Sequence, residues 1–276
     1  MELKIDGTEQ LYLHNDKLEN VQSTIIVVPK DAKIVYEVIR ITKGVPLFFN
    51  QHINRLHQSL ALSNLPVIND KNLRVSIKEL LKANYVSEKN LKVVVYFANQ
   101  QPEVYAFFIP SHYPPEQAYK DGVTVKLLTI ERLRPNVKLE NPTLRKTADG
   151  IIGGSNVYET LLVNDKGYIT EGSRSNFFAI IDDKIITPPA GDVLEGITRK
   201  MVISLAKNNQ LPIEERPIHT TEISLMSGAF ITGTSPKVLP ITQIEEHKLY
   251  PIPNITTQLL LFYNELTQTN LENESE

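Results

Sequence analysis

The chain has 276 residues, of which 41% are hydrophobic and 22% are charged, and its formal net charge is −3. A single hydrophobic core stops growing at about this length, so we expect two lobes. The slightly acidic balance disfavours a nucleic-acid-binding surface, and the lack of cysteine excludes disulfides, thiolate nucleophiles and cysteine-bound zinc. No apolar run approaches the roughly 18 residues of a membrane span. MELKIDGTEQ lacks the pattern of a signal peptide, so we expect a cytoplasmic protein with no membrane partner.

The first part of the chain mixes strand-like and helical segments. Runs rich in β-branched and aromatic residues predict strands at 23–29, 34–44, 46–49, 91–99 and 103–110. Apolar residues at helical spacing predict helices at 51–65 and 69–85, the second capped by Asn69 or Asp70. Strands, two helices and strands in this order indicate a small α+β lobe at 1–112.

A polar stretch at 113–121 contains Pro114 and Pro115 and has no periodicity, so it predicts a linker. The remainder, 122–276, is the predicted second and larger lobe. Its predicted strands lie at 123–133, 158–165, 167–172, 176–188 and on both sides of a turn within 228–244, and its predicted helices lie at 196–209 and 252–268. A weak helix is predicted from Pro142, and the polar end 266–276 is expected to fray.

Three features are typical of phosphate binding. The segment Gly196, Ile197, Thr198 opens an amphipathic helix, whose free N–H groups attract anions. Thr234 and Ser235 place two hydroxyl groups in a turn after a strand, and Arg55 lies on a helix and could form a fork with phosphate oxygens. Each feature alone also fits an ordinary helix start, a serine/threonine turn or a solvated charge.

Two further features are an acid and a lysine. Glu171 lies between a strand and a Gly/Ser turn, where a buried carboxylate would need a partner such as a protonated ring nitrogen. Lys138 and Lys146 are both candidates for a lysine that forms a Schiff base, and the residues alone do not choose between them. Together the five features meet the requirements of pyridoxal 5′-phosphate (PLP), which are a lysine, an acid at the pyridine nitrogen and phosphate ligands.

The order of these segments resembles the class IV aminotransferases, the fold-type IV PLP enzymes. The strongest matching segments are HINRLHQS, EGSRSN, LEGITR and TGTSPKVLPI, and the resemblance as a whole runs over about residues 34–244. The resemblance implies a small α+β lobe, a larger pseudo-barrel lobe and a homodimer. The family includes branched-chain aminotransferases, D-amino acid transaminases and aminodeoxychorismate lyases.

The resemblance also implies roles for individual residues. The family's Schiff-base lysine precedes the acid of the following strand by 21 positions, which selects Lys138 because that acid matches Glu159. Glu171 matches the acid at the pyridine nitrogen, and Tyr36 matches an aromatic residue on the substrate side. The remaining implied cofactor contacts are Arg55, Ser175, Asn176, Gly196, Ile197, Thr198, Thr234 and Ser235.

The implied activity is the transfer of an amino group between a small, branched-chain type of amino acid and a 2-oxo acid. The alternatives are a pyruvate-releasing aminodeoxychorismate lyase and a PLP-fold protein that binds a ligand without catalysis. The segment YFANQQPEVY lacks the Arg-x-His pair of D-amino acid transaminases, which disfavours a strict D-amino acid enzyme. The six histidines are scattered and form no HExxH pair, so no metal site is expected.

Overall fold

The computed structural model describes residues 2–5, 9–21, 25–29 and 32–275. Its internal contacts divide the chain into two units. Unit 1 contains Met1–His112, Val137–Glu140 and Gln268–Glu276, and unit 2 contains Tyr113–Asn136 and Asn141–Thr267. The stretch predicted as a linker, 113–121, carries helix α3 (Glu116–Asp121) and belongs to unit 2.

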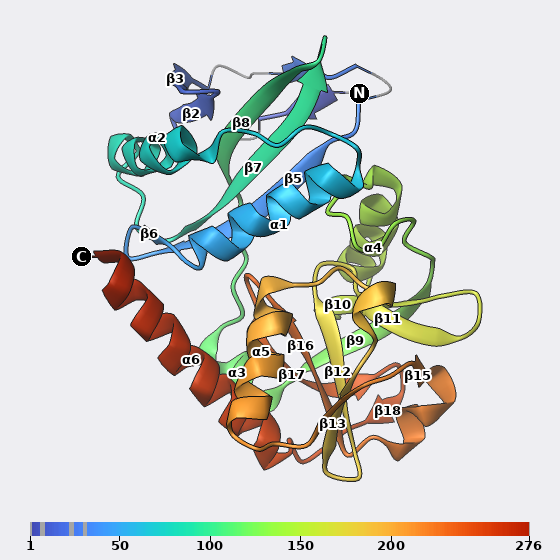
Figure 1. Ribbon diagram of the computed structural model, residues 1–276. Coiled ribbons are helices and arrows are strands. Elements are labelled where there is room, and N and C mark those ends of the chain that lie inside the picture. Colours follow the sequence, from blue (N-terminus) through green and yellow to red (C-terminus); the bar gives the residue numbers. More distant parts are fainter. Residues whose placement is uncertain (1, 6–8, 22–24, 30–31, 276) are drawn as a thin grey trace. The chain divides into compact units, whose positions relative to one another are not determined.

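A six-stranded sheet forms the centre of unit 1 (Figure 1). Its strands follow the order β3 (Lys17–Asn20), β2 (Leu11–His14), β8 (Gln101–Ile109), β7 (Lys89–Ala98), β5 (Val35–Thr42) and β6 (Val45–Pro46). A separate pair joins β1 (Glu2–Lys4) to β4 (Ile25–Val27). The strand predicted at 23–29 corresponds to β4 within the described residues, and residues 23 and 24 lie outside them.

Two helices cover one face of this sheet, α1 (Phe49–Leu62) and α2 (Asp70–Ala83). The side chain of Asn69 caps α2 by accepting a hydrogen bond from the backbone N–H of Lys71, so the predicted cap is confirmed. The strand predicted at 46–49 is wrong beyond Pro46, because α1 begins at Phe49 and buries that side chain. Between the helices and the sheet lies an apolar core of Leu13, Val35, Ile39, Ile41, Leu56, Leu60, Ile77, Leu80, Leu91, Val93, Val95 and Phe108, among others.

Unit 2 is built on a closed sheet. Strands β12 (Asn176–Ile181), β16 (Gly228–Gly233), β17 (Lys237–Ile244), β9 (Val123–Thr129), β10 (Glu159–Val163) and β11 (Tyr168–Gly172) pair in that order, and β11 pairs back with β12. This closure makes a six-stranded barrel, whose apolar interior includes Val125, Leu161, Phe177, Ile231 and Leu239. Four short strands extend it, β13 (Lys184–Thr187), β14 (Ile213–Glu215), β15 (Ile218–His219) and β18 (His247–Lys248).

The long strand predicted at 176–188 is two strands, β12 and β13, because Asp182 and Asp183 form a left-handed turn between them. Helix α4 (Pro142–Gly154) forms as predicted, with Pro142 in its first turn and the side chain of Asn141 as its cap. Its glycines do not prevent the helix. A Cβ atom at Gly150, Gly153 or Gly154 would meet nothing within 4 Å, so these positions face open space.

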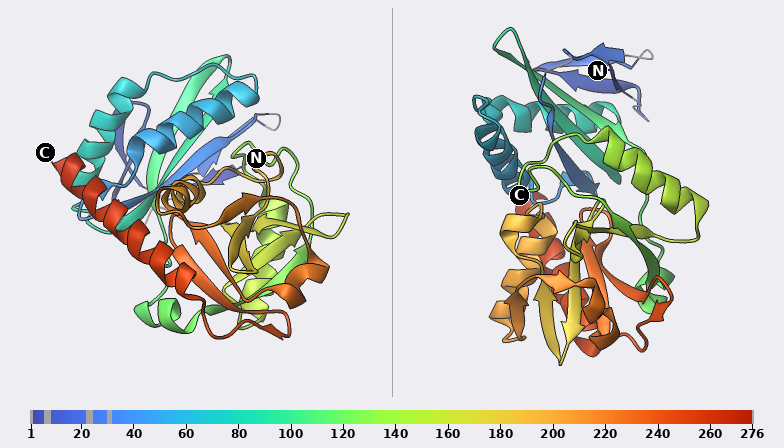
Figure 2. Two further views of the ribbon diagram at one scale, coloured as in Figure 1. Left: turned by 60° about the horizontal axis from the view of Figure 1, so that its bottom comes forward. Right: turned by 90° about the vertical axis from the view of Figure 1, so that its right-hand side faces the viewer.

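Helix α5 (Ile197–Asn208) packs beside β16 on the outside of the barrel (Figures 1 and 2). Two 3-10 helices, η1 (Ala190–Asp192) and η2 (Thr220–Leu225), complete the connections. Helix α6 (Asn254–Ser275) continues through the stretch that we expected to fray, because Leu271 is buried and Asn270 accepts a hydrogen bond from the backbone N–H of Phe48. Among the described residues, no helix is long and apolar enough to cross a membrane.

Candidate active site

Lys138 lies on the sheet of unit 1 although it follows the first strand of unit 2 in the sequence. Its carbonyl oxygen accepts a hydrogen bond of 3.1 Å from the backbone N–H of Tyr36, and Leu139 pairs with Val35. The Lys138 side chain is half-buried, and its Nζ lies 4.7 Å from the centre of the Tyr36 ring. Lys146, the other candidate, is exposed on α4. The structure therefore pairs Lys138, and not Lys146, with the predicted substrate-side aromatic residue.

Arg55 is held by a buried carboxylate. Its Nε and Nη2 each donate a hydrogen bond of 2.7 Å to the two oxygens of Glu37, and Nδ1 of His52 lies 2.8 Å from Oε2 of the same side chain. Burial raises the pKa of Glu37, but the charge and hydrogen bonds of Arg55 and the His52 contact outweigh it and lower the pKa to about 2. The result is a guanidinium group fixed in orientation at a site where Arg55 is only 7% exposed.

Lys138 and Arg55 are also linked through helix α1. The backbone N–H of Lys138 donates a hydrogen bond of 3.3 Å to Oγ of Ser59, which lies one helical turn after Arg55. Burial lowers the pKa of His52 and outweighs the hydrogen bond and the charge of Glu37, which raise it, while the positive charges of Arg55 and Lys138 lower it further. Unit 1 thus brings together three residues predicted from sequence, Tyr36, Arg55 and Lys138.

Glu171 lies at the end of β11 in unit 2 and is only 2% exposed. Its Oε2 accepts hydrogen bonds from the backbone N–H of Leu194, at 3.2 Å, and from Nδ2 of Asn176, at 3.5 Å. Nε of Arg132 lies 3.1 Å from Oε1. A buried carboxylate is costly unless it is paired in this way, so the surrounding groups favour a charged, acceptor side chain at this position.

Asn176 connects Glu171 to the start of α5. Its Nδ2 donates a second hydrogen bond, of 2.7 Å, to the carbonyl oxygen of Leu194. A Cβ atom at Gly196 would overlap Oδ1 of Asn176, so this close approach needs glycine. Among the described residues no side chain caps the N-terminus of α5, and Thr198 lies buried in its first turn. The uncapped N–H groups and the helix dipole favour an anion at this end.

Thr234 and Ser235 lie in the turn between β16 and β17. Thr232, just before this turn, pairs with Asn176 in the barrel sheet, and a Cβ at Gly233 would lie 3.5 Å from the carbonyl oxygen of Arg174. The turn is therefore next to the loop that follows Glu171. Ser175, a predicted cofactor contact on that loop, donates its hydroxyl to Glu159 at 3.1 Å.

Sequence reasoning missed the roles of four ionisable residues in this region: Glu37, His52, Arg132 and Glu159. Glu37 could have been found, because it is a lone acid at a position facing the helices in an alternating apolar strand. His52 lies one helical turn before Arg55 and was read as a scattered histidine. Glu159 served only to select the lysine. Nothing in the local sequence around Arg132 indicates its contact with Glu171.

The chain matches the family model described as "Amino-transferase class IV" over residues 34–244. A "Probable branched-chain-amino-acid aminotransferase" of Thermotoga maritima is 30% identical over 226 residues, which are 78% of this chain and 79% of that protein. A "D-alanine aminotransferase" of Bacillus licheniformis is 31% identical over 228 residues, 76% of this chain and 78% of that protein. Both relatives are covered over most of their length.

Solved structures share the fold. A T.th. branched-chain amino acid aminotransferase with pyridoxamine 5′-phosphate superposes with a TM-score of 0.83 at 19% identity, covering 96% of each chain. A branched-chain aminotransferase of Thermoproteus uzoniensis with norvaline gives a TM-score of 0.83 at 22% identity, covering 96% of this chain and 97% of the other. These similarities show that the chain shares the overall fold of these structures.

Proposed function

The chain belongs to the class IV aminotransferases, a family of PLP-dependent transferases, and we propose that it transfers the amino group of a small, branched-chain type of amino acid to a 2-oxo acid through Lys138. The observation that carries this proposal is the placement of Lys138 over the Tyr36 ring, on the sheet that also supports Arg55. No finding favours the alternative lyase reaction.

The residues present fit PLP. Each unit holds donors of the kind that a phosphate group needs. In unit 1 this is the buried, oriented guanidinium of Arg55, and in unit 2 these are the uncapped start of α5 at Ile197 and Thr198 and the Thr234–Ser235 turn. Glu171 supplies a buried acceptor for a protonated ring nitrogen. When bound, PLP supplies an electron-accepting ring that stabilises negative charge at the substrate Cα.

The chain's own residues would carry the proton transfers. We assign Nζ of Lys138 as the general base that removes the proton from Cα of the amino donor and as the acid that, in the opposite half-reaction, gives a proton to the carbon that was the keto carbon of the 2-oxo acid. Nζ of Lys138 lies 4.7 Å from the centre of the Tyr36 ring, and the residue is half-buried. Glu171, held by Arg132, Asn176 and Leu194, would hold a proton on the ring nitrogen by accepting its hydrogen bond. Lys138 and Glu171 therefore have separate tasks, one at the substrate Cα and one at the ring nitrogen.

The substrate class rests on relatives and on the surroundings of Tyr36. Branched-chain and D-alanine aminotransferases are among the similar proteins, and one similar structure contains norvaline. The amino acids named for these relatives are all small and apolar. On the sheet face of Tyr36, the neighbouring side chains include Ile34, Val94, Tyr105 and Phe107, which are buried and apolar or aromatic. This environment favours an apolar substrate side chain.

The test is an amino-donor panel with 2-oxoglutarate as acceptor. We expect L-valine, L-leucine and L-isoleucine to react at least about tenfold faster, in kcat/KM, than L-aspartate and L-lysine, because a charged side chain pays for desolvation. D-alanine and D-valine belong in the same panel, because they separate the two kinds of relative. Release of pyruvate from aminodeoxychorismate, without amino transfer to any acceptor, would contradict the proposal.

The oligomeric state and the cellular location are two further predictions. We propose that the enzyme is a homodimer, as the family resemblance implies, and that it is cytoplasmic. Light scattering of the purified protein at several concentrations checks the first, with a mass of twice 31.2 kDa as the expected result. Fractionation of the producing cells checks the second.

A further inference from the structure

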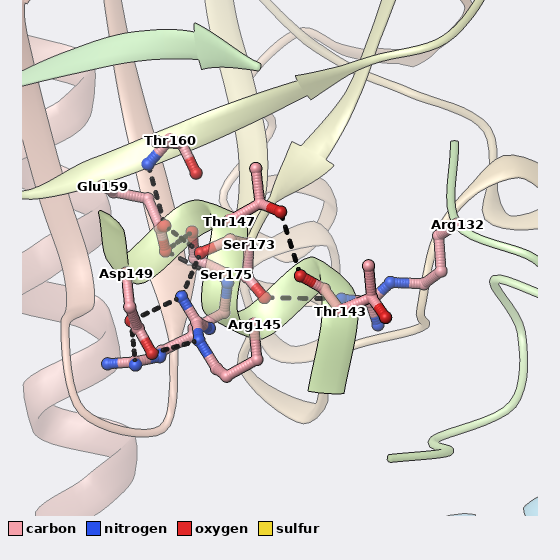
Figure 3. A network of polar contacts seen from close by, with 10 residues as sticks. Arg132, Thr143, Arg145, Thr147, Asp149, Glu159, Thr160, Ser173 and Ser175 are labelled. Atoms are coloured by element: carbon pink, nitrogen blue, oxygen red, sulfur yellow. Dashed lines mark hydrogen bonds and ion pairs between the residues drawn. The ribbon is translucent and has the colours of Figure 1, made fainter. Parts of the chain in front are cut away.

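A second buried acid, Glu159 on β10, lies outside the proposed set of cofactor contacts and is only 4% exposed. Four donors point at its two oxygens, which is the pattern of an acceptor-only carboxylate (Figure 3). Oε1 accepts from the Thr160 N–H at 2.9 Å and from Ser173 Oγ at 2.5 Å, and Oε2 accepts from the Arg174 N–H at 3.1 Å and from Ser175 Oγ at 3.1 Å.

Three of these four donors belong to the loop 173–175, which joins Glu171 at the end of β11 to Asn176 at the start of β12. The loop is tight, because the Gly172 N–H donates a hydrogen bond of 2.7 Å to the Ser175 carbonyl oxygen. A Cβ atom at Gly172 would overlap Ser175 Oγ. Glu159 therefore fixes the path of the backbone between two predicted cofactor contacts.

The same network reaches the Glu171 carboxylate through Arg132. Nη2 of Arg132 donates a hydrogen bond of 3.4 Å to the carbonyl oxygen of Ser173, while its Nε lies 3.1 Å from Oε1 of Glu171. A displacement of Ser173 would thus move both the backbone that carries Glu171 and the guanidinium group that contacts it.

Contacts on the outer side of the loop are more exposed. Arg145 of α4 donates to Ser173 Oγ at 3.0 Å, and Asp149 joins Arg145 and Arg174 across a half-exposed surface (Figure 3). Solvent screens such pairs, so each contributes little to stability. The buried Glu159 carboxylate is the main anchor of the loop.

We propose that Glu159 is a positioning residue that sets the orientation of Glu171 toward the pyridine nitrogen of PLP. The inference rests on the proposed role of Glu171 in the function above. It assigns Glu159 no contact with the substrate or the cofactor, only control of the loop that presents those contacts.

The first test is Glu159→Gln, which keeps the shape but turns one acceptor oxygen into an NH2 group facing two donors. We expect the PLP dissociation constant to rise roughly tenfold and kcat/KM to fall on the order of a hundredfold. The pH dependence of the absorbance of bound PLP should also shift, which a purely structural residue would not cause. Binding is followed by PLP absorbance, because the chain has no tryptophan. Asp149→Asn is the matched control, and it should leave all three quantities near their wild-type values.

A second variant and a double mutant make the test decisive. Ser173→Ala removes one donor to Glu159. It should raise the PLP dissociation constant and shift the absorbance profile in the same direction as Glu159→Gln does, but by a smaller amount. Because Glu159 is proposed to act through Glu171, adding Glu159→Gln to Glu171→Gln should lower kcat by much less than it does in the wild-type enzyme.

Several results would overturn the inference. In one, Glu159→Gln lowers thermal stability but leaves PLP affinity and the absorbance profile unchanged. In another, the fold-loss of kcat in the double mutant equals the product of the fold-losses in the two single mutants. If Glu159→Gln does not fold, an unchanged PLP affinity in Ser173→Ala overturns it equally. If Glu171→Gln itself behaves like the wild type, the proposed role of Glu171 fails instead.

Discussion

The guanidinium group of Arg55 and the carboxylate of Glu37 form a two-point contact inside unit 1, with both hydrogen bonds at 2.7 Å. Glu37 is fully buried, and His52 contacts the same carboxylate. The pair orients a cation that we assign to the PLP phosphate. It also makes this part of the protein sensitive to the loss of either charge, since a buried charge without its partner is strongly unfavourable.

Arg55→Met should therefore do two things. It should weaken PLP binding, and it should lower the free energy of unfolding of the PLP-free protein by about 3–5 kcal/mol, because Glu37 is left buried with His52 alone. Denaturant unfolding of the PLP-free variant measures the second effect separately. The control is Arg74→Met in the same unit, which removes partly exposed contacts with Glu274, Asn50 and the Phe49 ring and should cost about 1–2 kcal/mol. Equal losses in the two variants would contradict the special role of the buried pair.

The same pair predicts the direction of the pH dependence of stability. The pKa of Glu37 is about 2 in the folded protein and 4.5 in its ordinary environment, so the folded state binds this proton less readily than the unfolded state. The stabilisation is complete above pH 4.5 and is lost as the pH falls toward 2. The lowered pKa of His52 acts in the same direction below its ordinary value of 6.5. Unfolding free energies measured from about pH 6 to about pH 3 should fall less steeply in Glu37→Gln than in the wild type, and parallel curves would disprove the assignment.

Glu171→Gln should preserve the fold and impair catalysis. The amide keeps the shape but cannot act as a charged acceptor for a protonated ring nitrogen. We expect kcat to fall on the order of 10²-fold or more, with circular dichroism like that of the wild type. Rates of a single half-reaction with L-valine measure this directly. A loss of less than about twofold would mean that another group holds the ring nitrogen.

Two nearby glycines give a matched steric test. Gly196→Ala would drive a methyl group into Oδ1 of Asn176. Because Nδ2 of the same side chain donates a hydrogen bond to Glu171, PLP affinity should drop. Gly191→Ala meets nothing within 4 Å and should behave like the wild type. Overpacking of this kind typically costs about 1–3 kcal/mol. Titration of both variants with PLP, together with thermal unfolding, checks the prediction, and similar dissociation constants for the two variants would contradict it.

Local patterns predicted the elements whose cause is local. The apolar spacing of α1, α2 and α5 and the Asn69 cap lie within one stretch of sequence, and the structure has these helices. The hairpin β2–β3 was missed because its charged and apolar residues alternate over only a few positions, although Asn15 occupies a left-handed turn there. The end of α6 was missed because the contacts that hold it come from residues 200 or more positions away.

The site residues also divide into those that a local motif identifies and those that only the tertiary structure identifies. Glu171 and the start of α5 carry recognisable motifs, so they could be selected from sequence. The contacts of Arg132 and Glu159 depend on the pairing of β10, β11 and β12, which no single stretch of sequence specifies. The position of Lys138 on the sheet of unit 1 depends likewise on its pairing with β5, about 100 positions earlier.

The measurement that tests the account most directly is the identification of the lysine that binds PLP. The protein is loaded with PLP, the Schiff base is trapped by borohydride reduction, and the digested peptides are examined by mass spectrometry. We expect one modified peptide, with the added mass on Lys138, and loss of this label in Lys138→Ala but not in Lys146→Ala. A label on Lys146, or one that persists undiminished in Lys138→Ala, would contradict it.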